Sequence, residues 1–374
     1  MKPTLVIVLD DVGPANLAQD FCVPSRLTPE LADGVLKQAV RHQLWTMPSC
    51  SATRAALWTR RYPSSNGIGT IVRHNDDLGL DPNLAALPDV GPGRRVYYGK
   101  HHLCPQQMIN LHPDEMGWSL FHGHASNLAA GDQGGYYDWL ETREGETHMQ
   151  TQYAPTVMTA AALETIATSR ATLVVVGMAL IHKPYHYPPS SSFNVDQPEA
   201  MMRRLDQDAA QLVEMALSFD WRVVMFSDNG ATSDLGGGKG SLYQEGICTD
   251  LYVWNHDAES SALDVVDVGT LLDGQLSDDW DAQPIGRRRF HFAEKFSPNH
   301  RGRPDEPPPG AHSYAIARDE WKLISWGENH KPIGAQAVEL FNLEEDPREQ
   351  VNQAVHNKQV ARDLIELAHD EVLL

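Results

Sequence analysis

The sequence predicts an α/β fold with a large, mostly parallel central sheet flanked by helices. Three short apolar runs, TLVIVL (4–9), TLVVVGMALI (172–181) and WRVVMFSDNG (221–230), are rich in β-branched residues, as is typical of strands buried on both faces. A segment with helical periodicity, residues 199–217, separates the second run from the third. Because strand–helix–strand order of this kind implies parallel strands, we expect helices on both faces of the sheet.

The remaining elements follow from the same patterns. Leu205, Ala209, Leu212 and Ala216 recur at helical spacing within 199–217, which predicts one buried helix face. Further helices are predicted over residues 153–166 and, at the end of the chain, about 355–373. RRVYYGKHHL (94–103) is predicted to be another strand.

The C-terminal part of the chain has a different pattern. HSYAIARDEWKLISW alternates as the strands of an antiparallel hairpin do. The Pro- and Gly-rich segment from about 298 to 311 is predicted to be a linker or surface loop. We therefore expect a main α/β domain at 1–285 and a small C-terminal domain at 286–374, with an antiparallel sheet and a helix.

Composition excludes several classes of partner. The 374 residues carry a formal charge of −20, which argues against nucleic acid or an anionic membrane surface, since both need a basic face. The four cysteines, at 22, 50, 104 and 248, lack paired spacing, so neither a disulfide framework nor a zinc cluster is indicated. No apolar run has the length of a membrane span.

The N-terminus bears on location. MKPTLVIVLDD has an apolar segment too short for a secretory signal, and it has no small-residue cleavage site. We expect a cytoplasmic protein, or a periplasmic or secreted one if a signal peptide has been trimmed.

Acidic residues follow two of the predicted strands. Asp10 and Asp11 come directly after the first, and Asp228 and Asn229 end the third. The carboxyl ends of parallel strands are where open α/β sheets bind their ligands. Adjacent carboxylates repel each other unless a cation joins them, so these oxygens predict a site for a hard metal ion.

The segment MPSCSATRAALWTRRYP (47–63) predicts a turn that leads into a short helix. We expect Thr53 to cap this helix and Pro63 to end it. Cys50 then lies at the helix N-terminus, with Arg54 facing the same way, where the helix dipole and the guanidinium would lower the pKa of the thiol. Taken alone, Cys50 is more readily interpreted as a buried structural cysteine at a helix start, and the surrounding motif is what favours a reactive one.

Lys100 and His102 end the strand predicted over 94–103. Strand alternation puts both on one side, with His101 opposite. They are either part of a basic surface patch or, beside an anion site, a counter-charge and a proton carrier.

These motifs together resemble the sulfatase family. CSATR (50–54), followed by AALW, TRR and YP, resembles the signature Cys-x-Pro-Ser-Arg, with Ala52 in place of proline and Thr53 in place of serine. Position 60 has Arg where the family has Gly. The resemblance continues, in the family's order, through the strand–Asp–Asp opening, Gly-Lys-x-His, His-x-Pro, Ser-Asp-Asn-Gly, GGGKGSLYQEG (236–246) and VELFNLEEDPREQVNQA (338–354).

The resemblance implies a cofactor and a metal. In the family, the cysteine matching Cys50 is oxidised to formylglycine by a maturase, and radical-type maturases accept alanine at the position of Ala52. The resemblance assigns the metal to Asp10, Asp11, Asp228, Asn229 and the modified Cys50. Three carboxylates with an amide and a sulfate oxygen form a hard oxygen sphere, which favours Ca²⁺ over Mg²⁺ or Mn²⁺.

The resemblance also implies roles for the basic residues. Arg54 would polarise the sulfate, Lys239 and His182 would bind it and protonate the leaving oxygen, His102 would be the base that releases sulfate, and Lys100 would anchor the nucleophile. His186, which is also followed by x-Pro, is the alternative to His182.

The predicted function is hydrolysis of a sulfate monoester, on either a small molecule or a saccharide. Residues 117–153 resemble a substrate-facing insertion that would set specificity. Two alternatives stay open: a phosphonate or phosphate mono- or diester hydrolase on the same scaffold, and a pseudo-enzyme that only binds an anion. Asn229 favours sulfate, since the phosphoryl relatives tend to have His there.

Overall fold

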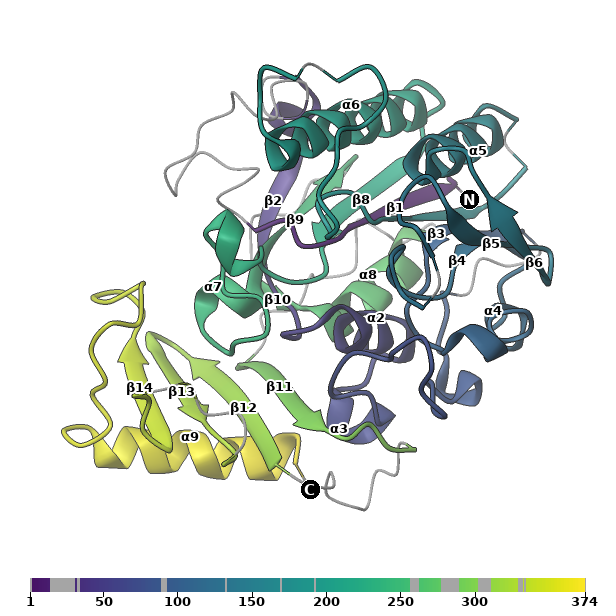
Figure 1. Ribbon diagram of the computed structural model, residues 1–374. Coiled ribbons are helices and arrows are strands. Elements are labelled where there is room, and N and C mark those ends of the chain that lie inside the picture. The colour runs from purple at the N-terminus through teal and green to yellow at the C-terminus, as the bar shows by residue number, and fades with distance from the viewer. Residues whose placement is uncertain are drawn as a thin grey trace.

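The computed structural model describes residues 2–13, 31, 34–88, 93–131, 133–168, 170–191, 193–255, 262–276, 289–301, 311–328, 332 and 334–373. Ten strands form one mixed sheet in the order β10-β2-β9-β8-β1-β7-β3-β4-β5-β6, and four form a separate antiparallel sheet, β11-β12-β13-β14 (Figure 1). The predicted fold class is therefore confirmed.

The strands of the large sheet are β1 (Thr4–Leu9), β2 (Val40–Trp45), β3 (Arg95–Lys100), β4 (Leu120–His124), β5 (Trp139–Arg143), β6 (Glu146–Gln150), β7 (Leu173–Met178), β8 (Arg222–Ser227), β9 (Cys248–Trp254) and β10 (Ala262–Asp264). At its centre, β8, β1, β7, β3 and β4 run parallel. Antiparallel pairings join β9 to β8 and β5 to β4. Because the central strands share one direction, their carboxyl ends meet at one edge.

Strand β1 shows why the central strands of the sheet appear in the sequence as continuous apolar runs. Val6 and Val8 belong to the apolar cluster on one face of the sheet, and Leu5, Ile7 and Leu9 belong to the cluster on the other. Successive side chains alternate between faces, so a strand covered on both faces has no polar position.

Helices cover both faces of the sheet, as predicted (Figure 1). One face packs against α5 (Ala154–Thr168) and α6 (Gln197–Ser218), and the other against α2 (Cys50–Thr59) and α8 (Val265–Leu276). The predicted inner face of α6, including Leu205 and Leu212, is buried. The short helices are α3 (Pro63–Asn66), α4 (His112–Glu115) and α7 (Gln244–Ile247), with 3-10 turns η2 (Val35–Gln38), η3 (Pro82–Leu84), η4 (Gln106–Met108) and η5 (Ser233–Leu235).

The C-terminal part contains β11 (His291–Ser297), β12 (Ala311–Arg318), β13 (Trp321–Ser325), β14 (Val338–Asn342) and α9 (Lys358–Glu371). One face of this sheet packs on α9, and the other joins the apolar cluster of the main domain through residues such as Ala315 and Phe341. The expected boundary at 285/286 and most of the expected linker at 298–311 lie outside the described residues.

Residues 117–153, which the sequence predicts to be a substrate-facing insertion, form part of the large sheet. They contain β4, β5 and β6, which extend the large sheet at its edge. The strands are short and polar, which hides them from periodicity analysis. Among the described residues, no helix is both long and apolar enough to cross a membrane.

A buried carboxylate joins the two sheets. Asp264 is fully buried and accepts hydrogen bonds from the Tyr62 hydroxyl (2.6 Å), from His291 Nδ1 (2.7 Å) and from the Phe292 amide (2.9 Å). The Tyr62 ring also packs on Phe292, with 5.1 Å between ring centroids.

Replacing Tyr62 with phenylalanine removes one of these bonds and keeps the ring packing. A hydrogen bond to a charged group contributes about 1.5–3 kcal/mol, so we expect the Tyr62→Phe free energy of unfolding to fall by roughly that amount. Chemical denaturation measures the change. An unchanged midpoint would show that this bond does not contribute to joining the sheets.

Candidate active site

The candidate site lies at the carboxyl edge of the parallel strands. Asp10 and Asp11 follow β1, and Asp228 and Asn229 follow β8, its neighbour in the sheet. Lys100 ends β3, and His182 follows β7. The topology thus brings together residues more than 200 positions apart, as the sequence-based prediction requires.

Cys50 completes a cluster of metal-ligating side chains. Oxygens of Asp10, Asp11 and Asp228 and the sulfur of Cys50 all lie within 4.8 Å of one another, and all four residues are buried. Cys50 is the first residue of α2, as predicted. The sulfur lies 3.9 Å from Asp11 Oδ1.

The start of α2 differs from the prediction in its cap. Ser49, in extended conformation, is the N-cap residue, and it makes no side-chain capping bond. Thr53 lies one turn inside the helix, where its hydroxyl accepts from the Met47 amide (3.0 Å) and donates to the Met47 carbonyl (3.1 Å). Thr53 therefore holds the chain that enters the helix, and the prediction that it caps α2 is wrong.

Arg54 is fully buried and points at the carboxylates. Its Nε donates to Asp228 Oδ2 (3.1 Å), and Nη2 lies 3.3 Å from Asp10 Oδ1. Nη1 donates to the Tyr97 hydroxyl (3.1 Å) and to the Lys100 carbonyl (2.8 Å). Every nitrogen of the guanidinium thus has a partner, so Arg54 fixes the positions of both acidic strand ends.

Lys100 neutralises Asp10. Its Nζ lies 2.8 and 2.6 Å from the two oxygens of Asp10, and both side chains are buried. Burial alone would raise the pKa of Asp10, but the charges of Lys100, His182 and Arg54 outweigh burial and hold that pKa well below its usual value. Burial and the charge of Asp10 raise the pKa of Asp228.

The Cys50 thiol is not activated by its surroundings. Burial, followed by the charge of Asp228, raises the pKa of this thiol to about 12. The expectation of a lowered pKa was wrong because the thiol is fully buried beside the negative charge of Asp228. Lys239 donates to the sulfur at 3.2 Å and also bonds Asp11 Oδ1.

The two candidate histidines lie in different surroundings. His182 Nε2 is 4.0 Å from Asp11 Oδ2, at the cluster. His186 Nε2 instead pairs with the Tyr153 hydroxyl (2.9 Å), and its ring packs against Tyr136 with 4.0 Å between centroids. The structure brings His182 to the cluster and places His186 in an aromatic group beside it.

His101 and His102 point in opposite directions, as expected, although β3 ends before them at Lys100. His102 has a positive φ of 58°, so a turn rather than strand alternation sets its direction. Burial and then the charge of Lys100 lower the pKa of His102, and its Nδ1 is buried without a partner. His101 packs against Tyr97 and Phe121, away from the cluster.

The oxygens present fit a hard cation. Asn229 Nδ2 donates to Asp11 Oδ1 (2.9 Å) and to the Gly230 carbonyl (2.9 Å). This orientation leaves Asn229 Oδ1 and Asp11 Oδ2 buried with no hydrogen-bond partner. Buried acceptors without donors are costly, and a divalent ion would satisfy both.

Sequence reasoning missed three residues of this region. The Tyr97 hydroxyl receives an Arg54 hydrogen bond and donates to the Lys100 carbonyl (2.6 Å). Ser227 Oγ accepts from the Val12 amide (3.0 Å) and so holds the turn after β1. His124, at the end of β4, is buried. In the sequence, no pattern around His124 distinguishes it from a structural histidine.

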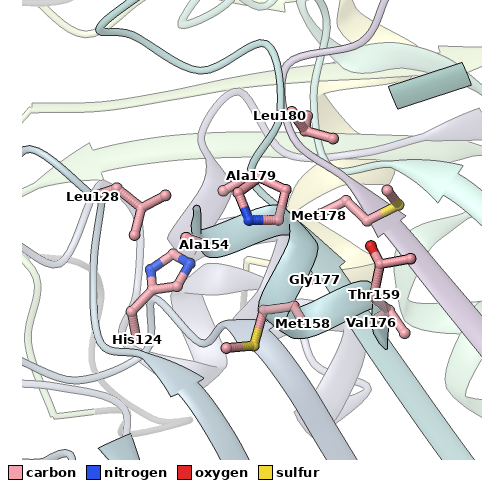
Figure 2. A pocket seen from close by; sticks show the side chains of 11 residues that line it. His124, Leu128, Ala154, Met158, Thr159, Val176, Gly177, Met178, Ala179 and Leu180 are labelled. Atoms are coloured by element: carbon pink, nitrogen blue, oxygen red, sulfur yellow. The ribbon is translucent and has the colours of Figure 1, made fainter. Parts of the chain in front are cut away.

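His124 lines a small cavity of about 20 Å³ beside the end of β7 (Figure 2). Leu128, Ala154 and Met158 form much of the remaining wall, so the cavity is mainly apolar. A volume of this size holds about one water molecule. This cavity is too small for a substrate. Its lining residues are part of the structure that supports the site.

Comparison with known proteins places these features in a family. The family model described as sulfatase matches residues 3–270. No curated protein matches the chain in sequence.

Solved structures share the fold across almost the whole chain. "Ps i-CgsB in complex with k-i-k-neocarrahexaose" is 18% identical with a TM-score of 0.74, covering 99% of this chain and 92% of that one. The PsFucS1 sulfatase from Pseudoalteromonas sp. is 15% identical with a TM-score of 0.73, covering 99% and 89%. BT4656, "in complex with its substrate D-Glucosamine-2-N, 6-O-disulfate", is 14% identical with a TM-score of 0.66, covering 99% and 97%.

The family match extends over most of the chain and includes each strand end that carries the acidic cluster, Arg54 and Lys239. Its members are hydrolases of sulfate esters. On this match, and on a fold shared from end to end, the chain belongs to the sulfatase family.

Proposed function

We propose that this chain hydrolyses a sulfate monoester through a formylglycine made from Cys50 by a maturase. The observation that carries the proposal is the position of Cys50: it begins α2 within 4.8 Å of three carboxylates, at the ligand-binding edge of the sheet. A structural cysteine would be surrounded by apolar side chains instead. The family match supports the same assignment.

A divalent cation, for which Ca²⁺ is our proposal, would be held by Asp10, Asp11, Asp228 and Asn229 together with the modified Cys50. The unpaired Asn229 and Asp11 oxygens support this ligand set. When bound, the cation withdraws charge from a sulfate oxygen, and a hydrated formylglycine supplies an oxygen nucleophile with a second hydroxyl.

The basic residues divide into two groups by exposure. The side chains of His182 and Lys239 are 18% and 15% exposed, whereas those of Arg54 and Lys100 are fully buried. We propose that the two exposed residues contact the sulfate, with His182 giving a proton to the leaving oxygen. Arg54 and Lys100 are positioning residues that hold Asp10 and Asp228.

His102 is proposed as the base for the release of sulfate. Burial and the Lys100 charge hold its pKa well below the usual value, so the imidazole is neutral before the step. Its buried Nδ1 has no hydrogen-bond partner.

A sulfated saccharide is the proposed substrate class. Aromatic residues lead from His182 to the surface: the buried Tyr136 donates its hydroxyl to the His182 carbonyl (2.7 Å), and the next residue, Tyr137, is 42% exposed. Tyr137 in turn donates to the Tyr187 carbonyl (2.9 Å), and Tyr187 packs on Phe193, which is 78% exposed. Flat aromatic faces of this kind bury the apolar face of a sugar ring. The saccharides named for the structural neighbours support this choice.

The direct test compares esters of one alcohol. Converted protein should release sulfate from an aryl sulfate and from sulfated saccharides, and should act far more slowly on the matching aryl phosphate. A higher rate on the phosphate would favour the phosphoryl hydrolase alternative. Binding of sulfate without turnover, in protein shown by mass to carry formylglycine, would favour the pseudo-enzyme.

His182→Ala is expected to lower kcat by about 10²–10⁴-fold, the usual cost of removing a positioned general acid. His186→Ala is the matched control, since it removes an imidazole from the aromatic group and leaves the cluster intact. We expect it to act mainly on KM. Steady-state kinetics on an aryl sulfate distinguish the two, and a larger kcat loss for His186→Ala would reverse the assignment.

A further inference from the structure

A second group of metal-ligating side chains lies just after β3, on the face of the sheet that packs against α2. One ligand atom each from His101, Cys104 and His112 lies within 4.8 Å of the others, and all three residues are buried. Two imidazoles and one thiol are the ligand types that bind zinc most strongly in proteins. The residues come from the turn after β3 and from the start of α4.

The hydrogen bonding of His112 orients it as a ligand. Its Nε2 lies 2.8 Å from the Leu80 carbonyl, which can only accept, so Nε2 carries the proton. In the neutral ring, Nδ1 then presents a lone pair to the group, where His101 Nε2 lies 2.9 Å away. A ring N–H held by a backbone carbonyl is the usual outer contact of a zinc-bound histidine.

Little movement separates the present geometry from a zinc site. Zinc–nitrogen bonds near 2.0–2.1 Å in a tetrahedron put two ligand nitrogens about 3.3 Å apart. The two imidazole nitrogens need to separate by only a few tenths of an ångström from their 2.9 Å. An apolar shell surrounds the group, since the His101 ring packs against Tyr97 and Phe121.

An exposed carboxylate lies near the group in the sequence. Glu115 lies one turn after His112 on α4. Burial raises the pKa of the Cys104 thiol, and the negative charge of Glu115 raises it further. Burial lowers the pKa of His112, and the charge of Glu115 acts against that effect. The Cys104 thiolate would offset one charge of the ion within the buried group, and the Glu115 carboxylate adds a negative charge outside it.

We propose that His101, Cys104 and His112 bind one Zn²⁺ ion. The site is structural and does not depend on the proposed function. His101 lies between Lys100 and His102, so an ion there ties the turn that carries both residues to α4. Binding releases the proton of Cys104, which gives zinc affinity that rises with pH.

Cobalt absorption tests the site without relying on activity. We use the Cys50→Ser full-length protein, which removes sulfur from the candidate active site. Co²⁺ should give it a thiolate-to-cobalt charge-transfer band, and one equivalent of Zn²⁺ should remove the band. The band should be lost when Cys104→Ser is added and retained when Cys248→Ser is added, because Cys248 lies on β9, outside the group.

His112→Gln in the same background keeps the thiol and removes one ligand. It should weaken Co²⁺ binding at least tenfold, the lower limit found when metal-site contacts are removed. Circular dichroism establishes that each variant is folded. If Cys104→Ser does not fold, the Co²⁺ affinity of His112→Gln decides whether the site exists. Absence of the band from folded Cys50→Ser protein, or its persistence with Cys104→Ser, would overturn the proposal.

Discussion

Protein made without a formylglycine-generating maturase is expected to keep the thiol at Cys50 and to be nearly inactive on sulfate esters. The thiol is buried among three carboxylates, and burial and Asp228 raise its pKa to about 12, so it is a poor nucleophile near neutral pH. Sulfur is also a soft ligand in a site of hard oxygens. A thiol, finally, has no second hydroxyl with which to release the bound sulfuryl group.

The measurement is the mass of the peptide that contains Cys50, taken on the same preparation as the rate. Activity should rise in proportion to the converted fraction when a radical-type maturase is co-expressed, since Ala52 occupies the position of the usual proline. Cys50→Ser should be inactive, or trapped as a sulfated serine, and Cys248→Ser is the control. Full multiple turnover by protein that holds only unmodified Cys50 would falsify this mechanism.

Asp11→Asn is expected to abolish activity and the effect of calcium on thermal stability. Asp11 Oδ2 is one of the two unpaired buried oxygens that we assign to the cation. Calcium at about 100 times its Kd should stabilise the protein that retains Asp11 by about 2.7 kcal/mol, which is seen as a higher Tm. Asn suits the left-handed conformation of residue 11 (φ 62°), so the backbone is preserved.

Asp220→Asn is the matched control, because it makes the same change of charge. Asp220 also has a positive φ (59°), but it is exposed and pairs with Lys2 (2.8 Å) far from the carboxyl edge of the sheet. Its Tm should still rise with calcium. If the calcium dependence of Asp11→Asn equals that of Asp220→Asn, the metal assignment is wrong.

The sequence predicted the main strands because they are buried on both faces. Strands β1, β7 and β8 are apolar at nearly every position, and such runs have few other interpretations. Strands β5 and β6 were missed, since they lie at the sheet edge and contain exposed polar residues such as Arg143 and His148. An edge strand needs no apolar pattern when one side faces water.

The positions of the acidic strand ends and of Cys50 were predictable because each motif ends a strand or begins a helix. Asp10, Asp228 and Cys50 are all placed by local elements, and the sheet order and the packing of α2 then bring them together. The pKa of Cys50 was not predictable. Its direction depends on the burial of the thiol and on the charge of Asp228 beside it, which only the packed interior determines.

The sequence by itself determined the α/β class, the acidic strand ends and the position of Cys50 at a helix start, since these depend on neighbours within a few residues. Only the tertiary structure decided that His182 rather than His186 lies beside Asp11, and that His101, Cys104 and His112 form one group. Both depend on how loops after different strands pack together. Distances between such loops are set by long-range contacts, which no local pattern records.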